Sequence, residues 1–203
     1  MFWDNVAGVY DLFVNIVNGK THRKLKRIVA DLIETGDEVL ECACGTGMLS
    51  AVIAEKCSRL TATDFSKKML KKARKNCADY HNIIFRFADI TALDFPDESF
   101  DKVVAGNVIH LLDEPSKALH ELNHVYKPSG MLIIPTYMNK KEKGQTGGFV
   151  AAVGKAGADF KRQFTVESYG QFFLEAGYTD VQVTLADGRI PCAVAVVKKE
   201  ARA

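Results

Sequence analysis

Short apolar runs alternate with amphipathic segments along most of this chain. Runs of strand length occur at 39–43, 60–64, 83–87, 100–105 and 131–136, with two more near 181–185 and 193–197. Between them, apolar residues recur at helical spacing, as in Met69, Leu70 and Ala73. This alternation of strands and helices favours an α/β fold built on a parallel sheet.

The first strand runs into a glycine turn. Residues 39–43 are followed by Cys44-Gly45-Thr46-Gly47, and a helical pattern begins at about residue 48. Glycine has no β-carbon, so the backbone can turn sharply here and a ligand can approach the main chain. The same turn also nearly matches a dinucleotide-binding fingerprint, with Ser50 in place of the third glycine, or could be a plain strand-to-helix connection, so it does not define a ligand by itself.

Acidic residues follow the second and third strands. Asp64 ends the second run nineteen positions after Gly45, about where a crossover unit places an acid that binds ribose hydroxyls. Ser66 already occupies the N-cap position of the next helix, which makes a capping role for Asp64 less necessary. Asp89 follows the third run, and Asn107 follows the fourth. Because parallel strands end at the same edge of a sheet, these side chains are predicted to meet in a ligand crevice.

The order of these motifs resembles that of a known family. Glu41-x-Ala43-x-Gly45-x-Gly47, Asp64, Ala88-Asp89 and Asn107-Val108-Ile109-His110 are similar to the motifs of class I S-adenosylmethionine-dependent methyltransferases, in particular the UbiE-like small-molecule branch. The resemblance implies one methyltransferase domain over 1–203. It also implies a Rossmann-like, doubly wound, seven-stranded, mostly parallel sheet with helices on both faces, an antiparallel last strand and an N-terminal helical lid.

The resemblance further implies S-adenosylmethionine as cofactor and a role for each motif. Glu41 and the glycine turn would hold the methionine portion, and Asp64 the ribose hydroxyls. Asp89 with Ile90 would frame the adenine, while Asn107 and Val108 would border the sulfonium end. The cofactor-binding residues implied are Tyr10, Glu41, Ala43, Gly45, Thr46, Gly47, Asp64, Phe65, Met69, Asp89, Ile90, Asn107 and Val108.

Ala43 departs from the family pattern, in which the first glycine of the turn usually stands at this position. The backbone must therefore accept an extra methyl group, and we expect the fold to tolerate it with weaker cofactor binding.

Two residues are candidates for catalysis. Methyl transfer from a sulfonium is an in-line displacement that needs alignment and exclusion of water more than a set of catalytic groups, although an oxygen or nitrogen nucleophile can need a base. His110, after the fourth strand, is the first candidate for that base, and Tyr137, just beyond the fifth strand, is the second. The alternative for His110 is a histidine that packs or bonds to the backbone.

Two segments flank this framework. Residues 1–35 are predicted to form two helices, which either cover the sheet or close over cofactor and substrate; the family resemblance favours a lid with Tyr10 near the cofactor. Residues 137–164 are rich in lysine and glycine and show little periodicity. A loop of this length in a compact domain is usually functional, so it is interpreted as a substrate-side insertion.

Composition limits the remaining possibilities. The 203 residues are 47% hydrophobic, which suits one domain, and the net charge of +2 gives little attraction to nucleic acid. The lysines and arginine at 67–75 form either a solvated helix face or a contact for an anionic substrate or RNA. No signal peptide or membrane span is recognised. The five cysteines lack paired CxxC spacing, so free thiols in the cytoplasm and no metal site are expected, and the oligomeric state is left open.

Two other functions remain open at this stage. The chain could be a noncatalytic protein that binds S-adenosylmethionine or S-adenosylhomocysteine, because no single catalytic group defines this chemistry. An NAD-dependent reductase would share the glycine turn, but Glu41 before the turn and Asp89 after the third strand count against it.

Overall fold

The computed structural model describes residues 10–138 and 161–199, with side chains described from residue 18 onward. Its strands are β1 (Glu38–Cys42), β2 (Arg59–Asp64), β3 (Ile83–Phe87), β4 (Phe100–Ala105), β5 (Tyr126–Tyr137), β6 (Val181–Ala186) and β7 (Cys192–Lys198). Its helices are α2 (Tyr10–Asp31), α3 (Met48–Ala54), α4 (Lys67–Asn76), the short 3-10 helix η1 (Ile109–Leu111), α5 (Pro115–Val125) and α7 (Val166–Glu175).

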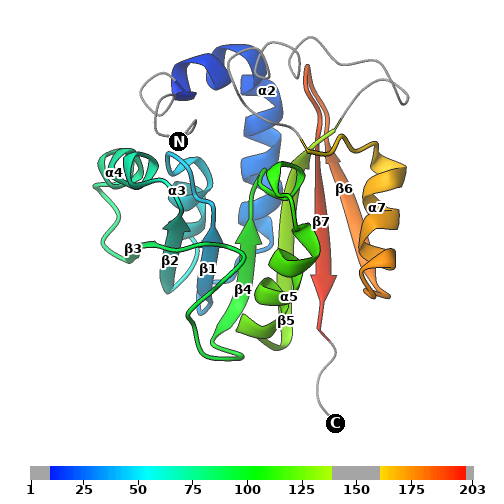
Figure 1. Cartoon of the computed structure of the whole chain (residues 1–203). Coiled ribbons are helices and arrows are strands. Elements are labelled where there is room, and N and C mark those ends of the chain that lie inside the picture. The colour runs from blue at the N-terminus through cyan, green and yellow to red at the C-terminus, as the bar shows by residue number, and fades with distance from the viewer. Residues whose placement is uncertain (1–9, 139–160, 200–203) are drawn as a thin grey trace.

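The strands form a single seven-stranded sheet in the order β3-β2-β1-β4-β5-β7-β6. The pairs among β1 to β5 are parallel, whereas β7 runs antiparallel to both β5 and β6. In Figure 1 the arrow of β7 accordingly points the opposite way to those of β1, β2 and β4. The predicted fold class, with its single antiparallel last strand, is confirmed.

The sheet has an apolar layer on each face. Alternate residues of one strand belong to different layers, as Leu132 and Ile134 do on one side and Ile133 on the other. The first layer is completed by α5 and α7, and the second by α2, α3 and α4. Strands buried on both faces need nearly continuous apolar sequence, which is why the runs were recognisable.

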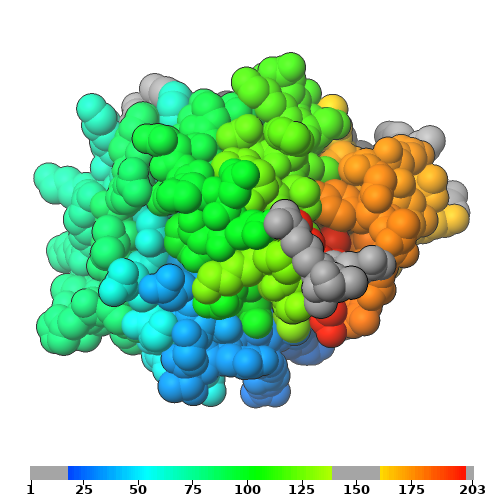
Figure 2. All heavy atoms as spheres, turned by 90° about the horizontal axis from the view of Figure 1, so that it is seen from below, coloured from blue at the N-terminus to red at the C-terminus, as the bar shows by residue number. Residues whose placement is uncertain are grey.

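Helix α4 begins where the sequence predicts. The hydroxyl of Ser66 accepts a hydrogen bond from the Met69 backbone N–H at 3.1 Å, as an N-cap residue does. Met69, Leu70 and Ala73 are buried, whereas Lys68 and the other cations at 67, 71, 74 and 75 are exposed. Seen from the end opposite the tips of the parallel strands, the region around α4 lies at the far side of the molecule from α7 (Figure 2).

The described N-terminal region contains two helical segments that meet at a kink. Helix α2 runs through residue 18, but Asn18 itself has non-helical angles, φ −133° and ψ 22°, so the helix is kinked there. The Asn18 amide is bound to the chain before β7: its Nδ2 donates to the Ile190 carbonyl at 2.9 Å, and its Oδ1 accepts from the Ile190 N–H at 3.1 Å. A buried polar side chain with two backbone partners explains the interruption.

Some predictions fall outside the described residues. These are the segment 1–9, the side chain of Tyr10, and residues 139–160 of the expected substrate-side insertion. The lid and the insertion therefore remain predictions. Within the described ranges, none of the helices combines the length and apolar character needed to cross a membrane.

Candidate functional site

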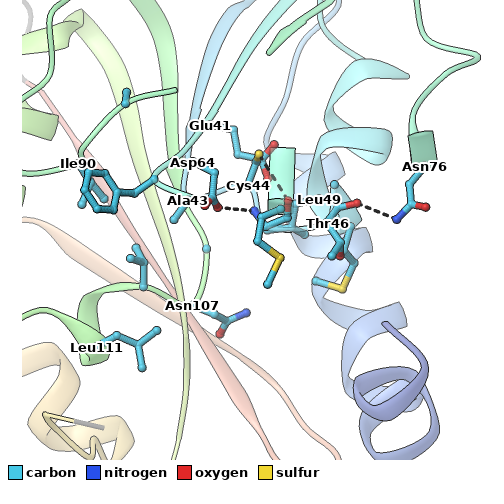
Figure 3. Close-up of a pocket in the computed structure, with 18 of the residues that line it drawn as sticks. Glu41, Ala43, Cys44, Thr46, Leu49, Asp64, Asn76, Ile90, Asn107 and Leu111 are labelled. Carbon is cyan, nitrogen blue, oxygen red and sulfur yellow. Dashed lines mark hydrogen bonds between the residues drawn. The ribbon is translucent and has the colours of Figure 1, made fainter. Parts of the chain in front are cut away.

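A cavity of about 520 Å³ lies at the edge of the sheet where the parallel strands end. Its lining residues belong to β1 and the glycine turn, to the ends of β2 and β4, to the segment after β3, and to the helices α2, α3 and η1. Figure 3 shows the side chains of Glu41, Asp64, Ile90, Asn107 and Leu111 around this space. The crevice at the carboxyl ends of the strands is where open α/β sheets bind ligands.

The turn after β1 depends on left-handed backbone. Gly45 has φ +56° and Gly47, the residue before α3, has φ +89°. A β-carbon on Gly47 would stand 2.8 Å from the sulfur of Cys77, so a larger residue cannot fit there without movement. The turn thus brings main chain, without intervening side chains, to the wall of the cavity.

Ala43 occupies a third left-handed position, with φ +56°. Such angles cost a residue with a β-carbon roughly 1–2 kcal/mol. The departure from the family glycine that is visible in the sequence is therefore a site of local backbone strain, and its methyl group borders the cavity.

Glu41 is buried in the floor of the cavity. Its side chain is 2% exposed, and its Oε2 accepts a hydrogen bond from the Ser50 hydroxyl at 2.5 Å. Burial raises the pKa of this carboxyl from 4.5 to about 8, and the nearby charge of Asp64 adds to the rise, although the Ser50 hydrogen bond opposes it. At neutral pH the group is therefore mostly protonated, and a cation placed beside it would favour its ionised form.

Asp64 links the glycine turn to the start of α4. Its Oδ2 accepts from the Gly45 N–H and its Oδ1 from the Ser66 N–H, both at 2.8 Å. The first of these bonds is drawn in Figure 3. A carboxylate offers about four lone-pair positions, so both oxygens can still accept hydrogen bonds from a ligand. Asp64 therefore shapes the turn and also faces the cavity.

The segment after β3 brings a third carboxylate to the same space. Asp89 Oδ1 accepts from both the N–H and the hydroxyl of Thr91 at 2.8 Å, which leaves Oδ2 outside these two bonds. Ile90, which follows it, is 8% exposed and supplies an apolar surface beside the carboxylate. A polar edge next to an apolar surface is suited to an aromatic base.

Asn107, after β4, is held in place by its backbone. It adopts φ +56°, and its N–H donates to the Pro135 carbonyl of β5 at 2.7 Å. Its side-chain oxygen accepts a weak hydrogen bond from the Cys192 thiol at 3.7 Å. The residue thus joins the tips of β4, β5 and β7 at the cavity wall.

Tyr137 borders the cavity at the end of β5, on the opposite side from Asp64 and Asp89. Its hydroxyl forms a hydrogen bond with His22 Nε2 of α2 at 2.8 Å. His22 is 2% exposed, and burial, together with the positive charge of Lys26, lowers its pKa to about 4. A neutral histidine from the N-terminal helix therefore fixes the orientation of this tyrosine.

His110, the first candidate for the base, lies in a buried environment. Its ring is 4% exposed, and burial lowers its pKa to about 4. The ring lies edge-on to Tyr137, with centroids 6.3 Å apart. Among the described residues, Tyr137 lines the cavity, whereas His110 contacts the Tyr137 ring and is not one of the lining residues.

The structure brings together every predicted cofactor-binding residue whose side chain it describes. Tyr10 is the exception, because its side chain lies outside that description. Sequence reasoning missed several other lining residues: Lys26, Cys44, Met48, Leu49, Ala51, Asn76, Ala88, Gly106, Leu111 and Leu112. Lys26 stands four positions after His22 on one helix, a spacing that places both on the same face and that was available in the sequence. Asn76, whose amide donates to the Thr46 carbonyl at 2.9 Å, carried no such signal.

All five cysteines are buried and free. Burial raises the pKa of the Cys42 thiol to about 12 and that of Cys44 well above its usual range, so both remain protonated and pack as small apolar groups. In the described ranges, no group of histidine, cysteine and acidic side chains is arranged to hold a metal ion.

Comparisons with known proteins find relatives among methyltransferases. A family model described as a methyltransferase domain matches residues 40–134. A demethylmenaquinone methyltransferase from Renibacterium salmoninarum is 36% identical over 137 residues, covering 66% of this chain and 56% of the relative. The ubiquinone/menaquinone biosynthesis C-methyltransferase UbiE of Methylococcus capsulatus is 31% identical over 140 residues, covering 65% and 56%. The matched region is thus little more than half the length of these relatives.

A similar fold is found in a solved structure of the DhpI–SAH complex. It superposes with a TM-score of 0.76 at 19% identity, over 99% of this chain and 95% of that one. The domain match and the relatives make residues 40–134 of this chain similar to a methyltransferase domain, and the solved structure shows that the fold is shared. Its sequence relatives include UbiE-type proteins, as the motif order had indicated.

Proposed function

We propose that this protein binds S-adenosylmethionine and transfers its methyl group to a small organic acceptor by in-line displacement. The observation that carries the proposal is the meeting of three carboxylates, Glu41, Asp64 and Asp89, in one cavity beside the left-handed glycine turn. They come from three successive strand ends, so their order along the sheet matches the order of chemical groups along the cofactor.

The cavity fits this cofactor in size and chemistry. A volume of about 520 Å³ is within the usual range for small-molecule sites. Asp64 would accept hydrogen bonds from the ribose hydroxyls, and Asp89 from the adenine amino group, with Ile90 against the ring. Glu41 would accept from the ammonium of the methionine portion, which favours the ionised form of this buried acid.

S-adenosylmethionine supplies a methyl group on a sulfonium, which a nucleophile can displace directly. The contribution of the chain is to position both reactants and exclude water. If Asp89, Asp64 and Glu41 hold the cofactor along β3, β2 and β1, the methyl acceptor lies toward β4 and β5. That part of the cavity is bordered by the apolar side chains of Val108 and Leu111.

Tyr137 is the polar group that we assign to the acceptor side. Its hydroxyl is oriented by His22 and borders the cavity near the end of β5. It would hydrogen-bond to a polar atom of the acceptor and relay the proton that the acceptor loses to His22 Nε2. A base role for His110 remains a prediction, and its ring would act through Tyr137.

The relatives suggest the kind of acceptor. Their names include demethylmenaquinone, a molecule with a ring and a long apolar part. An apolar acceptor with a polar ring substituent also agrees with the mixed lining of the cavity. We therefore propose an acceptor of this kind and, from the free buried cysteines, a cytoplasmic location.

The experiment has a binding and a turnover part. Calorimetry with S-adenosylmethionine, S-adenosylhomocysteine and NADH tests the cofactor, and mass spectrometry of reactions with demethylmenaquinone and smaller phenols tests transfer. Micromolar binding of the first two and methylation of an acceptor are expected. Binding of NADH without binding of S-adenosylmethionine would refute the proposal, and cofactor binding without turnover on any acceptor would favour a sensor.

A further inference from the structure

The cavity contains one cationic side chain among its described lining residues, Lys26 of α2. It shares the space with three acids, Glu41, Asp64 and Asp89. A ligand that complements this set carries positive or hydrogen-donating groups at several points and one anionic group. The arrangement thus predicts where a negative charge would be bound.

Lys26 lies at the glycine-turn end of the cavity. Helix α2 packs against α3, and Met48 and Ala51 of α3 line the same space. The Lys26 charge acts on two further groups: it adds to the lowering of the His22 pKa that burial causes, and it opposes the larger rise that burial and the Glu41 charge cause in the pKa of the Cys77 thiol. Lys26 lines the cavity together with Gly45 and Gly47 of the turn, and the Cys77 thiol bonds to the Gly47 carbonyl at 3.5 Å.

The position of Lys26 is fixed by its helix. Asn18, two turns earlier, is bonded to Ile190, and the Thr21 hydroxyl donates to Asn18 Oδ1 at 2.7 Å. His22 is bonded to Tyr137. These bonds hold α2 against the sheet, so a charge at position 26 is presented to the cavity at a defined place.

The amino-acid portion of S-adenosylmethionine carries an ammonium and a carboxylate on the same carbon atom. The protein groups that bind them must therefore lie close together across the cavity. With the ammonium at Glu41, the carboxylate requires a cation near the glycine turn. We infer that Lys26 binds this carboxylate, an inference that rests on the proposed function and adds a residue to it.

The test compares two ligands that differ in this group. S-adenosylhomocysteine contains the amino-acid portion, whereas 5′-methylthioadenosine lacks it and keeps the nucleoside. Calorimetry on Lys26→Met should show affinity for S-adenosylhomocysteine falling by about tenfold to a hundredfold, the range for a lost charged hydrogen bond, with affinity for methylthioadenosine unchanged. Lys26→Arg should retain most of the affinity. Lys24→Met is the matched control, because Lys24 is exposed on the same helix, and it should change neither affinity.

Other results would overturn the inference. An equal loss for both ligands in Lys26→Met would mean that the lysine supports the fold of α2, and circular dichroism would show that loss of structure. Unchanged binding of both ligands would mean that the carboxylate lies elsewhere. If the wild-type protein binds neither ligand, the proposed function itself fails. If the wild type binds both ligands and Lys26→Met binds them equally well, only the role of Lys26 fails.

Discussion

The buried carboxyl of Glu41 makes the stability of this protein depend on pH in a way that one substitution can test. Its pKa is raised from 4.5 to about 8 in the folded protein. When the pKa of a group is higher in the folded than in the unfolded protein, its contribution to stability is complete below the pKa of the unfolded state. That contribution is lost as the pH rises through the pKa of the folded state. At pH 7 the folded carboxyl must hold a proton that the unfolded chain has released.

The size of this cost follows from the two pKa values. Each pH unit between 4.5 and 7 is worth about 1.4 kcal/mol, so the cost at pH 7 is roughly 3 kcal/mol. Glu41→Gln keeps the shape and an oxygen that can accept from Ser50, but carries no titrating proton. Its amide N–H group needs a buried partner, which offsets roughly 1–2 kcal/mol of the gain. We therefore expect the free energy of unfolding of Glu41→Gln to exceed that of the wild type by about 1–2 kcal/mol at pH 7. At pH 4.5 the variant should be no more stable than the wild type.

Urea denaturation at both pH values measures this difference. The midpoint should shift while the m-value stays constant, since the surface exposed on unfolding does not change. Glu38→Gln is the matched control at the other end of β1, because the Glu38 side chain is 46% exposed and its replacement removes no buried carboxyl group. A gain of equal size at pH 4.5 and pH 7, or a loss confined to pH 7, would refute the titration of Glu41 as the cause.

The same substitution should act oppositely on ligand binding. In the wild type, an ammonium beside Glu41 favours the ionised carboxylate, so S-adenosylhomocysteine should release close to one proton at pH 7. Calorimetry in buffers with different ionisation enthalpies detects that proton. Glu41→Gln should release none and should bind more weakly. Proton release that persists in the variant would show that another group titrates.

Further predictions concern other parts of the cavity. Asp64→Ala should weaken cofactor binding by roughly 1–3 kcal/mol in calorimetry. Stability should also fall, because the two backbone N–H groups that bond to Asp64 lose their acceptor. A folded variant with wild-type affinity would exclude the ribose role. Ala43→Gly should relieve the left-handed strain of roughly 1–2 kcal/mol, but the greater flexibility of glycine in the unfolded chain offsets part of this. The free energy of unfolding measured by denaturation should therefore rise by roughly 0.5–1 kcal/mol, and a fall would contradict the strain. Tyr137→Phe should lower kcat at least tenfold with unchanged affinity for S-adenosylhomocysteine; if His110→Ala alone has this effect, the base is His110.

Much of this fold and of the cofactor side of the cavity could be predicted from the sequence. The central strands β1, β2 and β4 are buried on both faces and require nearly uninterrupted apolar residues. Glu41, Asp64 and Asp89 stand near the ends of β1, β2 and β3, and carboxyl groups are rarely buried without function or partners. The cap at Ser66 is also a local signal, because the bond joins residues only three apart.

The parts that could not be predicted depend on contacts between distant segments. The bond between His22 and Tyr137 joins residues 115 positions apart, and the one between Asn18 and Ile190 joins residues 172 apart. Apolar periodicity gives the face of a helix that is buried, but not the residue that it meets. The kink at Asn18, which divides α2 into two helical segments, depends on a partner of this kind.

The place of β7 in the sheet affects how the chain can fold during synthesis. It is the last described strand to be made, yet it lies between β5 and β6 and pairs with both. Until residues 192–198 leave the ribosome, β5 exposes an apolar edge, and β6 has no neighbour through which to join the sheet. We therefore expect the native sheet to close only after this strand is released, and a nascent chain stalled before it to depend on chaperones or aggregate.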